Sequence, residues 1–323
     1  MNAVMVTVNE RYASLLQLFL ASLHQHYPNH PEVLACIDGW SAQAKQRLQG
    51  RFPFVSWIDV KELEWTAGAP MKHEEAFNHP VMYARWAALT KRFDHYDTIV
   101  YLDVDMLVLG PLDELCASAE MRAFEETYPE KDQLVFRHRA SADLQQLLLA
   151  DGLQHQRWDV AANAGVLALP RSVRTPAHLA EAQRITRRYG QHLMWGDQSM
   201  LNIWMARHQL SVVHDCRFNY QLRLLWKLDR PCCQFRDVRI LHFNGQRRDT
   251  VRLMAAAFVA STFVPFGRAM LPALLRLLAS PAPPWLRGYR MREWIWRFVV
   301  ERALAAAVAR RDDTPAKSPA SAN

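Results

Sequence analysis

Short apolar runs alternate with amphipathic segments along the first third of the chain. The runs with the length and β-branched content of buried strands are residues 3–8, 33–37, 54–59 and 98–102. Between them, apolar residues recur at helical spacing in 15–23, and a second helix is expected around 41–48. This alternation of strands and helices predicts a parallel sheet wrapped by helices.

The later pattern predicts further elements and one long loop. Helices are expected at 82–93, 112–115, 142–149, 176–189 and from 195 onward, and strands at 161–170 and 238–241. Residues 66–80 are polar, are flanked by turn formers and form a long loop for a compact domain. A loop of this kind is typical of an active-site lid.

Two carboxylates, Asp103 and Asp105, directly follow the apolar run 98–102. Their i, i+2 spacing would place both side chains on the same face of a strand. In open α/β sheets, ligands collect beyond the carboxyl ends of the strands. Paired carboxylates suit Mg²⁺ or Mn²⁺, ions that usually bridge to substrate phosphates. The pair therefore predicts a metal and diphosphate clamp, and the alternative is a solvated strand end with two acidic residues.

Arg85, Asn163 and Gly165 are further candidates because of their places in the predicted elements. Arg85 belongs to the helix before the acidic pair, where it can reach a phosphate or simply be solvated. Asn163 lies at the entrance of a strand, and its amide can both donate and accept hydrogen bonds to a sugar hydroxyl. Gly165 permits a ligand to approach the backbone closely.

The last candidates lie in the second half of the chain. Asp197 and Gln198 occupy the first turn of a predicted helix, where an aspartate is also common as a cap or dipole partner. His242 ends the last predicted strand and is followed by Gly245 and Arg248. These three residues can supply a metal ligand, a close backbone approach and a phosphate contact, although a lone histidine in such a place is often structural.

The excess positive charge is confined to the C-terminal part of the chain. Residues 251–323 contain eleven basic and four acidic residues and so supply the whole net charge of +7. Residues 1–250 contain 28 basic and 28 acidic residues and carry no net charge. After the proline-rich hinge at 281–284, tryptophan and tyrosine interleave with arginine, as in an interfacial helix on anionic lipid. The alternatives are packing against the rest of the chain and nucleic-acid binding, and we expect no nucleic-acid partner.

The cysteines and the lack of a hydrophobic span predict the compartment. The five cysteines are odd in number and lack C-x-x-C spacing, so neither a disulfide framework nor a zinc site is expected, and Cys232 and Cys233 are interpreted as packing residues. Neither a secretory signal nor a run long enough to span a bilayer is found. We therefore expect a cytoplasmic protein, peripheral on the inner face of the cell membrane.

Five ordered segments within residues 3–250 resemble the motifs of glycosyltransferase family 8, which includes bacterial lipopolysaccharide galactosyl- and glucosyltransferases, glycogenin and galactinol synthase. The segments are V-T-V-N-E-R-Y, Y-A-R-W-A-A-L with the strand T-I-V-Y-L-D-V-D, A-A-N-A-G-V-L-A-L, G-D-Q-S-M-L-N and H-F-N-G-Q-R-R. The resemblance implies an α/β fold of the GT-A, Rossmann-like type, with a mixed, mainly parallel sheet flanked by helices. This catalytic domain would span 1–250, followed by a helical basic extension at 251–311 and a disordered tail at 312–323.

The resemblance also implies a function: metal-dependent retaining transfer of a hexose from a UDP-sugar to a lipid-linked glycan acceptor, such as lipopolysaccharide core or capsule. It implies that Mn²⁺, or Mg²⁺, binds Asp103, Asp105 and His242. The implied donor-site residues are Val8, Asn9 and Tyr12 at the uridine, with Tyr12 stacked on the base; Arg85, Asn163, Gly165, Asp197 and Gln198 around the donor sugar; Gly245 and Arg248 at the phosphates; and Val104 between the two aspartates.

The chain departs from the family pattern near the donor sugar. Arg248 replaces the family's lysine, Asp249 and Thr250 replace a common proline and tryptophan, and residues 193–196 lack an acidic residue often found before the D-Q pair. For catalysis, Asp197 is the candidate carboxylate of a double displacement. The alternative is front-face attack, in which Gln198 stabilises the cationic sugar, and we favour this second route.

Two other functions are compatible with parts of the sequence. A catalytically silent nucleotide-sugar or membrane-surface binding protein would retain the motifs without turnover. The strand V-Y-L-D-V-D also resembles the first motif of haloacid-dehalogenase-like phosphohydrolases, but that chemistry needs the acidic strand near the N-terminus and a later lysine and acidic pair. The sequence leaves the donor sugar, the acceptor, the linkage and the oligomeric state open.

Overall fold

The computed structural model describes residues 1–63, 65, 80–126, 142–153, 161–193, 196–222, 224, 232–243, 250–263, 271–272 and 275. The lid expected at 66–80 therefore lies outside the described residues except for Pro80, as do Gly245, Arg248 and the chain beyond 275. In the part of the chain that is described, no helix has the length and apolar character needed to cross a bilayer.

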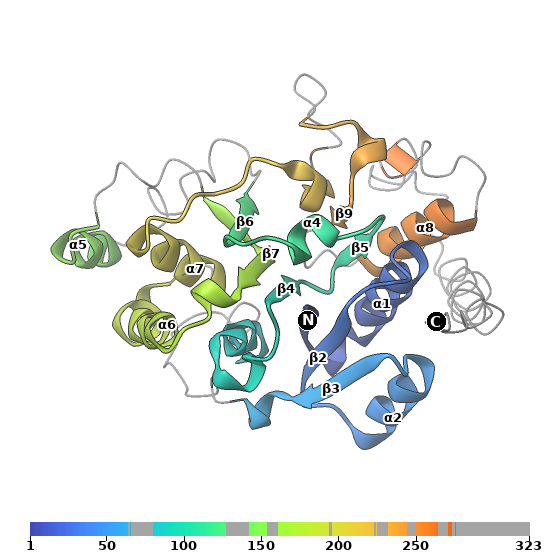
Figure 1. Ribbon diagram of the computed structural model, residues 1–323, viewed down its shortest axis with the longest axis horizontal. Coiled ribbons are helices and arrows are strands. Elements are labelled where there is room, and N and C mark those ends of the chain that lie inside the picture. Colours follow the sequence, from blue (N-terminus) through green and yellow to red (C-terminus); the bar gives the residue numbers. More distant parts are fainter. Residues whose placement is uncertain are drawn as a thin grey trace, which may run out of the picture.

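A six-stranded sheet in the order β3-β2-β1-β4-β7-β6 forms the centre of the molecule (Figure 1). Its strands are β1 (Ala3–Asn9), β2 (Glu32–Asp38), β3 (Val55–Asp59), β4 (Thr98–Leu102), β6 (Arg122–Glu125) and β7 (Ala162–Pro170). Strands β1 to β4 pair in parallel, whereas β7 pairs antiparallel with both β4 and β6. The sheet is thus mixed and mainly parallel, as expected, and β6 is the strand that the sequence pattern did not reveal.

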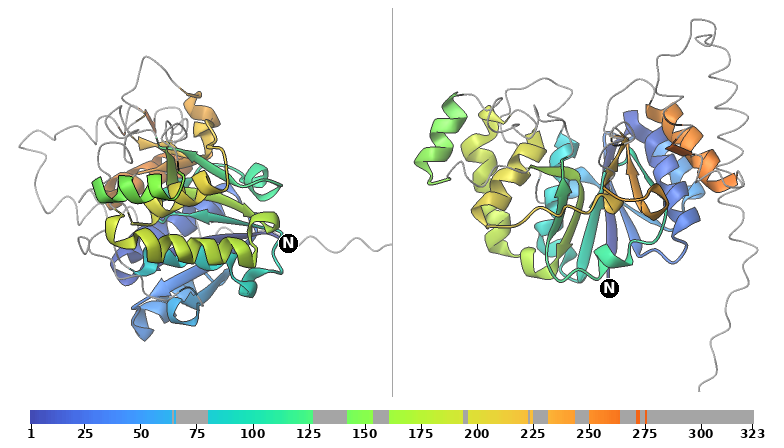
Figure 2. Two further views of the ribbon diagram at one scale, coloured as in Figure 1. Left: turned by 90° about the vertical axis from the view of Figure 1, so that its left-hand side faces the viewer. Right: turned by 90° about the horizontal axis from the view of Figure 1, so that it is seen from above.

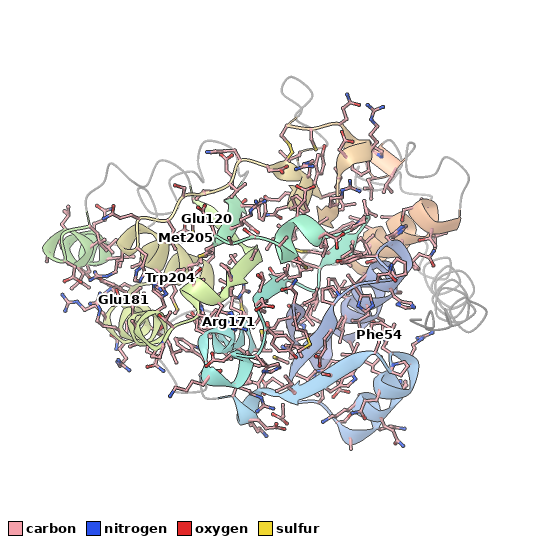
Figure 3. The ribbon with its side chains drawn as sticks, viewed as in Figure 1. Phe54, Glu120, Arg171, Glu181, Trp204 and Met205 are labelled. Carbon is pink, nitrogen blue, oxygen red and sulfur yellow. A yellow bond between two sulfur atoms is a disulfide. The ribbon has the colours of Figure 1, made fainter. Side chains whose placement is uncertain are left out.

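Side chains alternate across this sheet and build one core on each face. In β1, Val4, Val6 and Val8 belong to the core that packs against α1 (Ala13–His26) and α8 (Thr250–Phe263). Ala3 and Met5 belong to the opposite core. Figure 2 shows the sheet between α1 and α8 on one face and α6 (Pro176–Tyr189) and α7 (Gly196–Arg207) on the other. Figure 3 labels Phe54, which packs against the first core, and Trp204, which belongs to the second.

The remaining helices follow the sequence pattern closely, with one exception. The helices are α2 (Ala42–Arg51), α3 (Pro80–Tyr83), α4 (Asp113–Cys116), α5 (Ala142–Ala150), α6 (Pro176–Tyr189) and α7 (Gly196–Arg207). Ser41 caps α2, because its hydroxyl accepts a hydrogen bond from the backbone N–H of Ala44. The single helix expected at 82–93 is wrong: α3 has one turn and is followed by 3-10 turns at Ala84–Leu89 and Lys91–Phe93. All six residues of the Ala84–Leu89 turn are buried, and Phe93 is the buried residue of the second turn, so tertiary packing decides the shape of this segment.

A second, three-stranded sheet in the order β5-β9-β8 stands beside the carboxyl end of β4. Its strands are β5 (Met106–Val108), β8 (Tyr220–Gln221) and β9 (Ile240–His242). β5 pairs antiparallel with β9, so that Met106 lies opposite His242. This small sheet brings the end of the chain's last predicted strand to the acidic pair, which precedes β5.

A disulfide joins Cys216 and Cys232, so the expectation of no disulfide is wrong. The two residues are separated by 16 positions, and Cys216 belongs to a buried 3-10 turn that leads into β8. Cysteine spacing failed as a signal because the pairing is set by the fold around β8 and not by a short motif. Cys36, Cys116 and Cys233 are free, and Cys36 and Cys116 are buried.

Candidate active site

Asp103, Asp105 and His242 come together at the junction of the two sheets. One ligand atom from each of the three lies within 4.8 Å of the others. Both aspartates lie in the turn between β4 and β5 and not on a strand, so their proximity comes from that turn and not from strand alternation. The backbone N–H of Phe243 donates to the carbonyl of Asp105 at 2.9 Å, which fixes His242 beside this turn.

His242 is buried and faces Asp105 with one ring nitrogen. Its Nε2 lies 3.4 Å from Asp105 Oδ1, and its Nδ1 lies 2.8 Å from Asn219 Oδ1. Burial alone would lower the pKa of His242, but Asp105 and Asp103 raise the net pKa above its ordinary value. A ring held between an amide and a carboxylate is the arrangement in which histidine serves as a metal ligand.

The donor set of this cluster suits a divalent cation. Carboxylate oxygens with one imidazole nitrogen are ligands that Mn²⁺ accepts, and close carboxylates repel one another unless a cation lies between them. Asp103 retains 29% side-chain exposure, so the cluster is open on one side to a further ligand. A metal held by Asp103, Asp105 and His242 would therefore keep coordination positions for a substrate.

Arg85 is buried at the centre of the site, so the alternative of a solvated helix residue is wrong. Its Nη2 lies 2.7 Å from Asp197 Oδ2 and 3.2 Å from Asp103 Oδ1, and the guanidinium lies over the Tyr101 ring at 4.3 Å. It also donates to the carbonyl of Ala164. The sequence allowed a phosphate contact for Arg85, and the resemblance put it near the donor sugar; in the structure its guanidinium pairs with two carboxylates.

Asp197 and Gln198 enter the site from the first turn of α7. Asp197 is 2% exposed, and burial raises its pKa to about 6 although Arg85 favours the ionised form. Among the described residues, its Oδ2 accepts no hydrogen bond, because the contact with Arg85 is an ion pair of poor hydrogen-bond geometry. Gln198 is less buried, and its Oε1 lies 3.3 Å from both Asn163 Nδ2 and the backbone nitrogen of Ala164.

Asn163 makes its hydrogen bonds inside the protein. Its Nδ2 donates to Glu126 Oε2 at 2.7 Å, and its Oδ1 accepts from the backbone N–H of Gly165 at 3.0 Å and from Asn219 Nδ2 at 3.1 Å. The direct sugar contact that the sequence suggested would therefore compete with these bonds. In the structure, Asn163 instead joins Gln198 on one side of the site to Asn219 on the other.

Gly165 is required by close packing of side chains. A Cβ at this position would lie 2.6 Å from His242 Cε1 and 2.7 Å from Met106 Cε, distances that real Cβ atoms do not show. The sequence assigned this glycine to close approach of a ligand, but the atom that approaches belongs to the histidine of the metal cluster. Its carbonyl also accepts from the backbone N–H of Asp103 at 2.9 Å, so Gly165 contacts two of the three candidate ligands.

The residues expected around a uridine lie at the same edge of the main sheet. Val8 and Asn9 end β1, which pairs with β4, and Tyr12 follows in the 3-10 turn before α1. Tyr12 and Val104 are partly buried against the same core. Asn9 Oδ1 is buried and finds no hydrogen-bond partner among the residues described, which leaves an acceptor for a ligand N–H or O–H.

Three residues of the site carried no sequence signal of their own. Tyr101 donates to Asp103 Oδ1 at 2.8 Å and is bonded to Thr7 at 3.0 Å, although it reads as part of an apolar strand. Glu126 directly follows β6 and Asn219 directly follows the 3-10 turn Cys216–Phe218, and neither belongs to a recognisable motif. Only Glu126 could have been suspected, since it is a carboxylate at the end of a strand, but that strand was itself missed.

Comparison with known proteins shows the family to which the chain belongs. The family model described as "Glycosyl transferase family 8" matches residues 3–248. No curated protein sequence matches the chain. Among solved structures, the galactosyltransferase LgtC in complex with donor and acceptor sugar analogs is 18% identical, with a TM-score of 0.54, and the match covers 89% of this chain and 99% of that one.

Two further structures show the same fold. An active-site mutant of LgtC is 16% identical with a TM-score of 0.57, again over 89% of this chain and 99% of that one. The bifunctional glycosyltransferase WbbM, without ligand, is 18% identical with a TM-score of 0.55, over 83% of this chain and 50% of that one. At these identities the likeness shows the fold alone, and that fold is GT-A.

Proposed function

The chain belongs to glycosyl transferase family 8, and on that premise we propose that it is a metal-dependent, retaining hexosyltransferase that uses a UDP-sugar. That it is a glycosyltransferase follows from the family, and GT-A glycosyltransferases generally use a divalent metal and a nucleotide sugar. The observation that carries the proposal further is the convergence of Asp103, Asp105 and His242 from distant parts of the chain. The phosphohydrolase alternative is set aside, because family and fold both differ.

The residues around the cluster suit donor cleavage. A divalent ion, Mn²⁺ in our proposal, would stabilise the negative charge that develops on the leaving diphosphate. The Arg85 guanidinium lies within 3.2 Å of both Asp103 and Asp197, so its positive charge offsets part of the repulsion between the two carboxylates. Asn9 offers its free Oδ1 to the nucleotide, and Tyr12 offers an aromatic ring at the end of β1.

The burial of Asp197 favours the front-face route to retention. A carboxylate that is 2% exposed and ion-paired with Arg85 is poorly placed to attack a sugar carbon, since attack would break that pair. Gln198 is more accessible, and its Oε1 is held only by two contacts at 3.3 Å. We propose that Asp197 positions the donor sugar and that Gln198 stabilises the positive charge at the reacting carbon.

The acceptor and the location of the enzyme complete the proposed function. LgtC was crystallised with both donor and acceptor sugar analogs. For this chain we propose a lipid-linked glycan, such as lipopolysaccharide core or capsule, as acceptor. We place the enzyme on the cytoplasmic face of the membrane, supported by the basic, aromatic segment after residue 281.

The cysteines bear on the redox state of the compartment. The three free cysteines fit a reducing compartment, whereas the Cys216–Cys232 disulfide fits an oxidising one. Thiol titration of the isolated protein distinguishes the two.

Binding of candidate donors with and without metal tests the central part of the proposal. Calorimetry on the wild-type protein with UDP-glucose, UDP-galactose, UDP-N-acetylglucosamine and GDP-mannose should show one UDP-sugar bound only when Mn²⁺ is present. The Asp105→Ala variant should lose this metal-dependent binding while remaining folded. Donor binding that is unchanged in Asp105→Ala would contradict the metal assignment, and slow release of UDP from the bound donor would distinguish an enzyme from a silent binding protein.

A further inference from the structure

Asn219 lies between the metal cluster and the donor-sugar side of the site. It is 1% exposed and stands between the 3-10 turn Cys216–Phe218 and β8. Its side-chain amide spans two residues of the site: Oδ1 lies 2.8 Å from His242 Nδ1, and Nδ2 donates to Asn163 Oδ1 at 3.1 Å. Each end of the amide thus faces a residue that the sequence pattern predicted to belong to the site.

The direction of this hydrogen-bond chain is fixed from its far end. The backbone N–H of Gly165 can only donate, and it donates to Asn163 Oδ1 at 3.0 Å. On the other side of the same amide, Asn163 Nδ2 donates to Glu126 Oε2 at 2.7 Å. These two contacts together leave a single orientation for the Asn163 amide.

The same logic then fixes Asn219 and His242. Because Asn163 Oδ1 is an acceptor, the group of Asn219 that faces it must be the NH₂ group, and Asn219 Oδ1 must face the histidine. An amide oxygen can only accept, so His242 Nδ1 carries the hydrogen. In the neutral ring, the lone pair then lies on Nε2, the nitrogen that faces Asp105.

We propose that Asn219 is a positioning residue that selects the metal-binding tautomer of His242 and couples it, through Asn163, to Gln198. This inference rests on the proposed function, since it assumes that His242 is a metal ligand. Partners of this kind hold the ring orientation of a metal-bound histidine, and their loss commonly weakens metal binding about 10- to 100-fold. The coupling follows from the shared Asn163 amide, whose Nδ2 also faces Gln198 Oε1 at 3.3 Å.

Direct titration of Mn²⁺ into the metal-free protein, without any sugar donor, tests the proposal. Asn219→Leu removes both hydrogen bonds at similar volume and should weaken Mn²⁺ binding about 10- to 100-fold. Asn219→Asp keeps an acceptor for His242 Nδ1 and should keep affinity within about threefold, while it places an oxygen against Asn163 Oδ1 and disturbs the sugar side. Asn219→Asp should therefore bind Mn²⁺ well but bind the UDP-sugar more weakly relative to UDP.

A matched control separates this effect from simple destabilisation. Thr186→Val, on α6, also removes a buried hydrogen bond, from its hydroxyl to the carbonyl of Ala182, but Thr186 has no contact with the metal cluster. This variant should bind Mn²⁺ like the wild type. An Asn219→Leu protein that is folded and binds Mn²⁺ as tightly as the wild type would overturn the inference alone, whereas a wild-type protein that binds no Mn²⁺ would overturn the proposed function as well.

The tautomer can be observed in the protein with Asn219 unchanged. In metal-free protein labelled with ¹⁵N-histidine and titrated to a pH at which the ring is neutral, His242 should show a protonated Nδ1 and an unprotonated Nε2. His242→Gln identifies the resonances. The opposite tautomer, with the hydrogen on Nε2, would refute the assigned direction of the chain even if Asn219→Leu failed to fold.

Discussion

Arg85 Nη2 lies 2.7 Å from Asp197 Oδ2, and both side chains are at least 95% buried. The two residues are more than a hundred positions apart, and each was identified by a separate motif. Together with Asp103, whose side chain is 29% exposed and belongs to the metal cluster, they form a group of one cation and two anions. The stability of the fold and the binding of metal should both depend on these charges.

Loss of the positive charge of Arg85 should lower the stability of the folded protein. Arg85→Met leaves Asp103 and Asp197 without their counter-charge, and the free energy of unfolding should fall by about 3–5 kcal/mol. The matched control is Arg171→Met, because Arg171 pairs with Asp97 at the surface, where both side chains are more than half exposed. That change should cost at most about 1 kcal/mol in urea unfolding. Equal losses in the two variants would contradict the role of Arg85.

Asp197 predicts a specific pH dependence of stability. Burial raises its folded-state pKa from 3.8 to about 6, so between these values the folded protein binds more protons than the unfolded chain. The contribution of Asp197 to the free energy of unfolding therefore falls as the pH rises from about 4 to about 6 and is constant above. Urea unfolding of wild type and Asp197→Asn across this range isolates the group. A stability difference that instead grows with pH would mean that Arg85 outweighs burial and lowers the pKa.

Gly165→Ala should damage the metal cluster. The added Cβ would lie 2.6 Å from His242 Cε1, so the imidazole must move, and overpacking should cost about 1–3 kcal/mol. Mn²⁺ affinity, measured by titration, should fall at least about tenfold, because ligand geometry tolerates little displacement. Gly50→Ala is the control: Gly50 lies in α2 with open space around it, and this change should raise stability by about 0.5–1 kcal/mol without affecting Mn²⁺ binding. Unaltered metal binding in Gly165→Ala would show that the imidazole can relocate freely.

The Cys216–Cys232 disulfide should stabilise the segment that carries Asn219. Its loop spans 16 positions, for which reduction is expected to lower the free energy of unfolding by about 3 kcal/mol. Thiol titration of the denatured protein should find three free cysteines before reduction and five after it. The double variant Cys216→Ser/Cys232→Ser should show no further loss on reduction. Five thiols in protein isolated without reductant would mean that the bond does not form in the cell.

The basic C-terminal segment should bind anionic membranes. Removal of residues 281–323, which contain interleaved tryptophan and arginine, should release the protein from vesicles that contain phosphatidylglycerol. Neutral phosphatidylcholine vesicles serve as control, and Mn²⁺ titration shows that the remaining chain is folded. Undiminished sedimentation of the shortened protein with anionic vesicles would refute the membrane role of this segment.

Much of the candidate site was visible in the sequence because its residues sit at the ends of regular elements. Asp103 and Asp105 follow a strand, His242 ends one, and Asp197 begins a helix. Hydrophobic periodicity marks such boundaries over a short range. Their partners were not visible: Asn219 and Glu126 lie in irregular segments, and Arg85 was placed on a helix that the structure replaces by 3-10 turns.

Local patterns in the sequence predicted most strands and helices in their observed order, the acidic pair after β4 and the family resemblance, because each depends on residues close together in the chain. Which residues meet in the site depends on the tertiary structure. The pairing of β5 with β9 joins Asp105 to a histidine far along the chain, and the antiparallel β7 brings Gly165 and Asn163 against the same cluster. Such contacts arise from the packing of whole helices and strands. A polar residue that forms a hydrogen bond in a buried site, such as Asn219, cannot be distinguished in the sequence from any other polar residue in a loop.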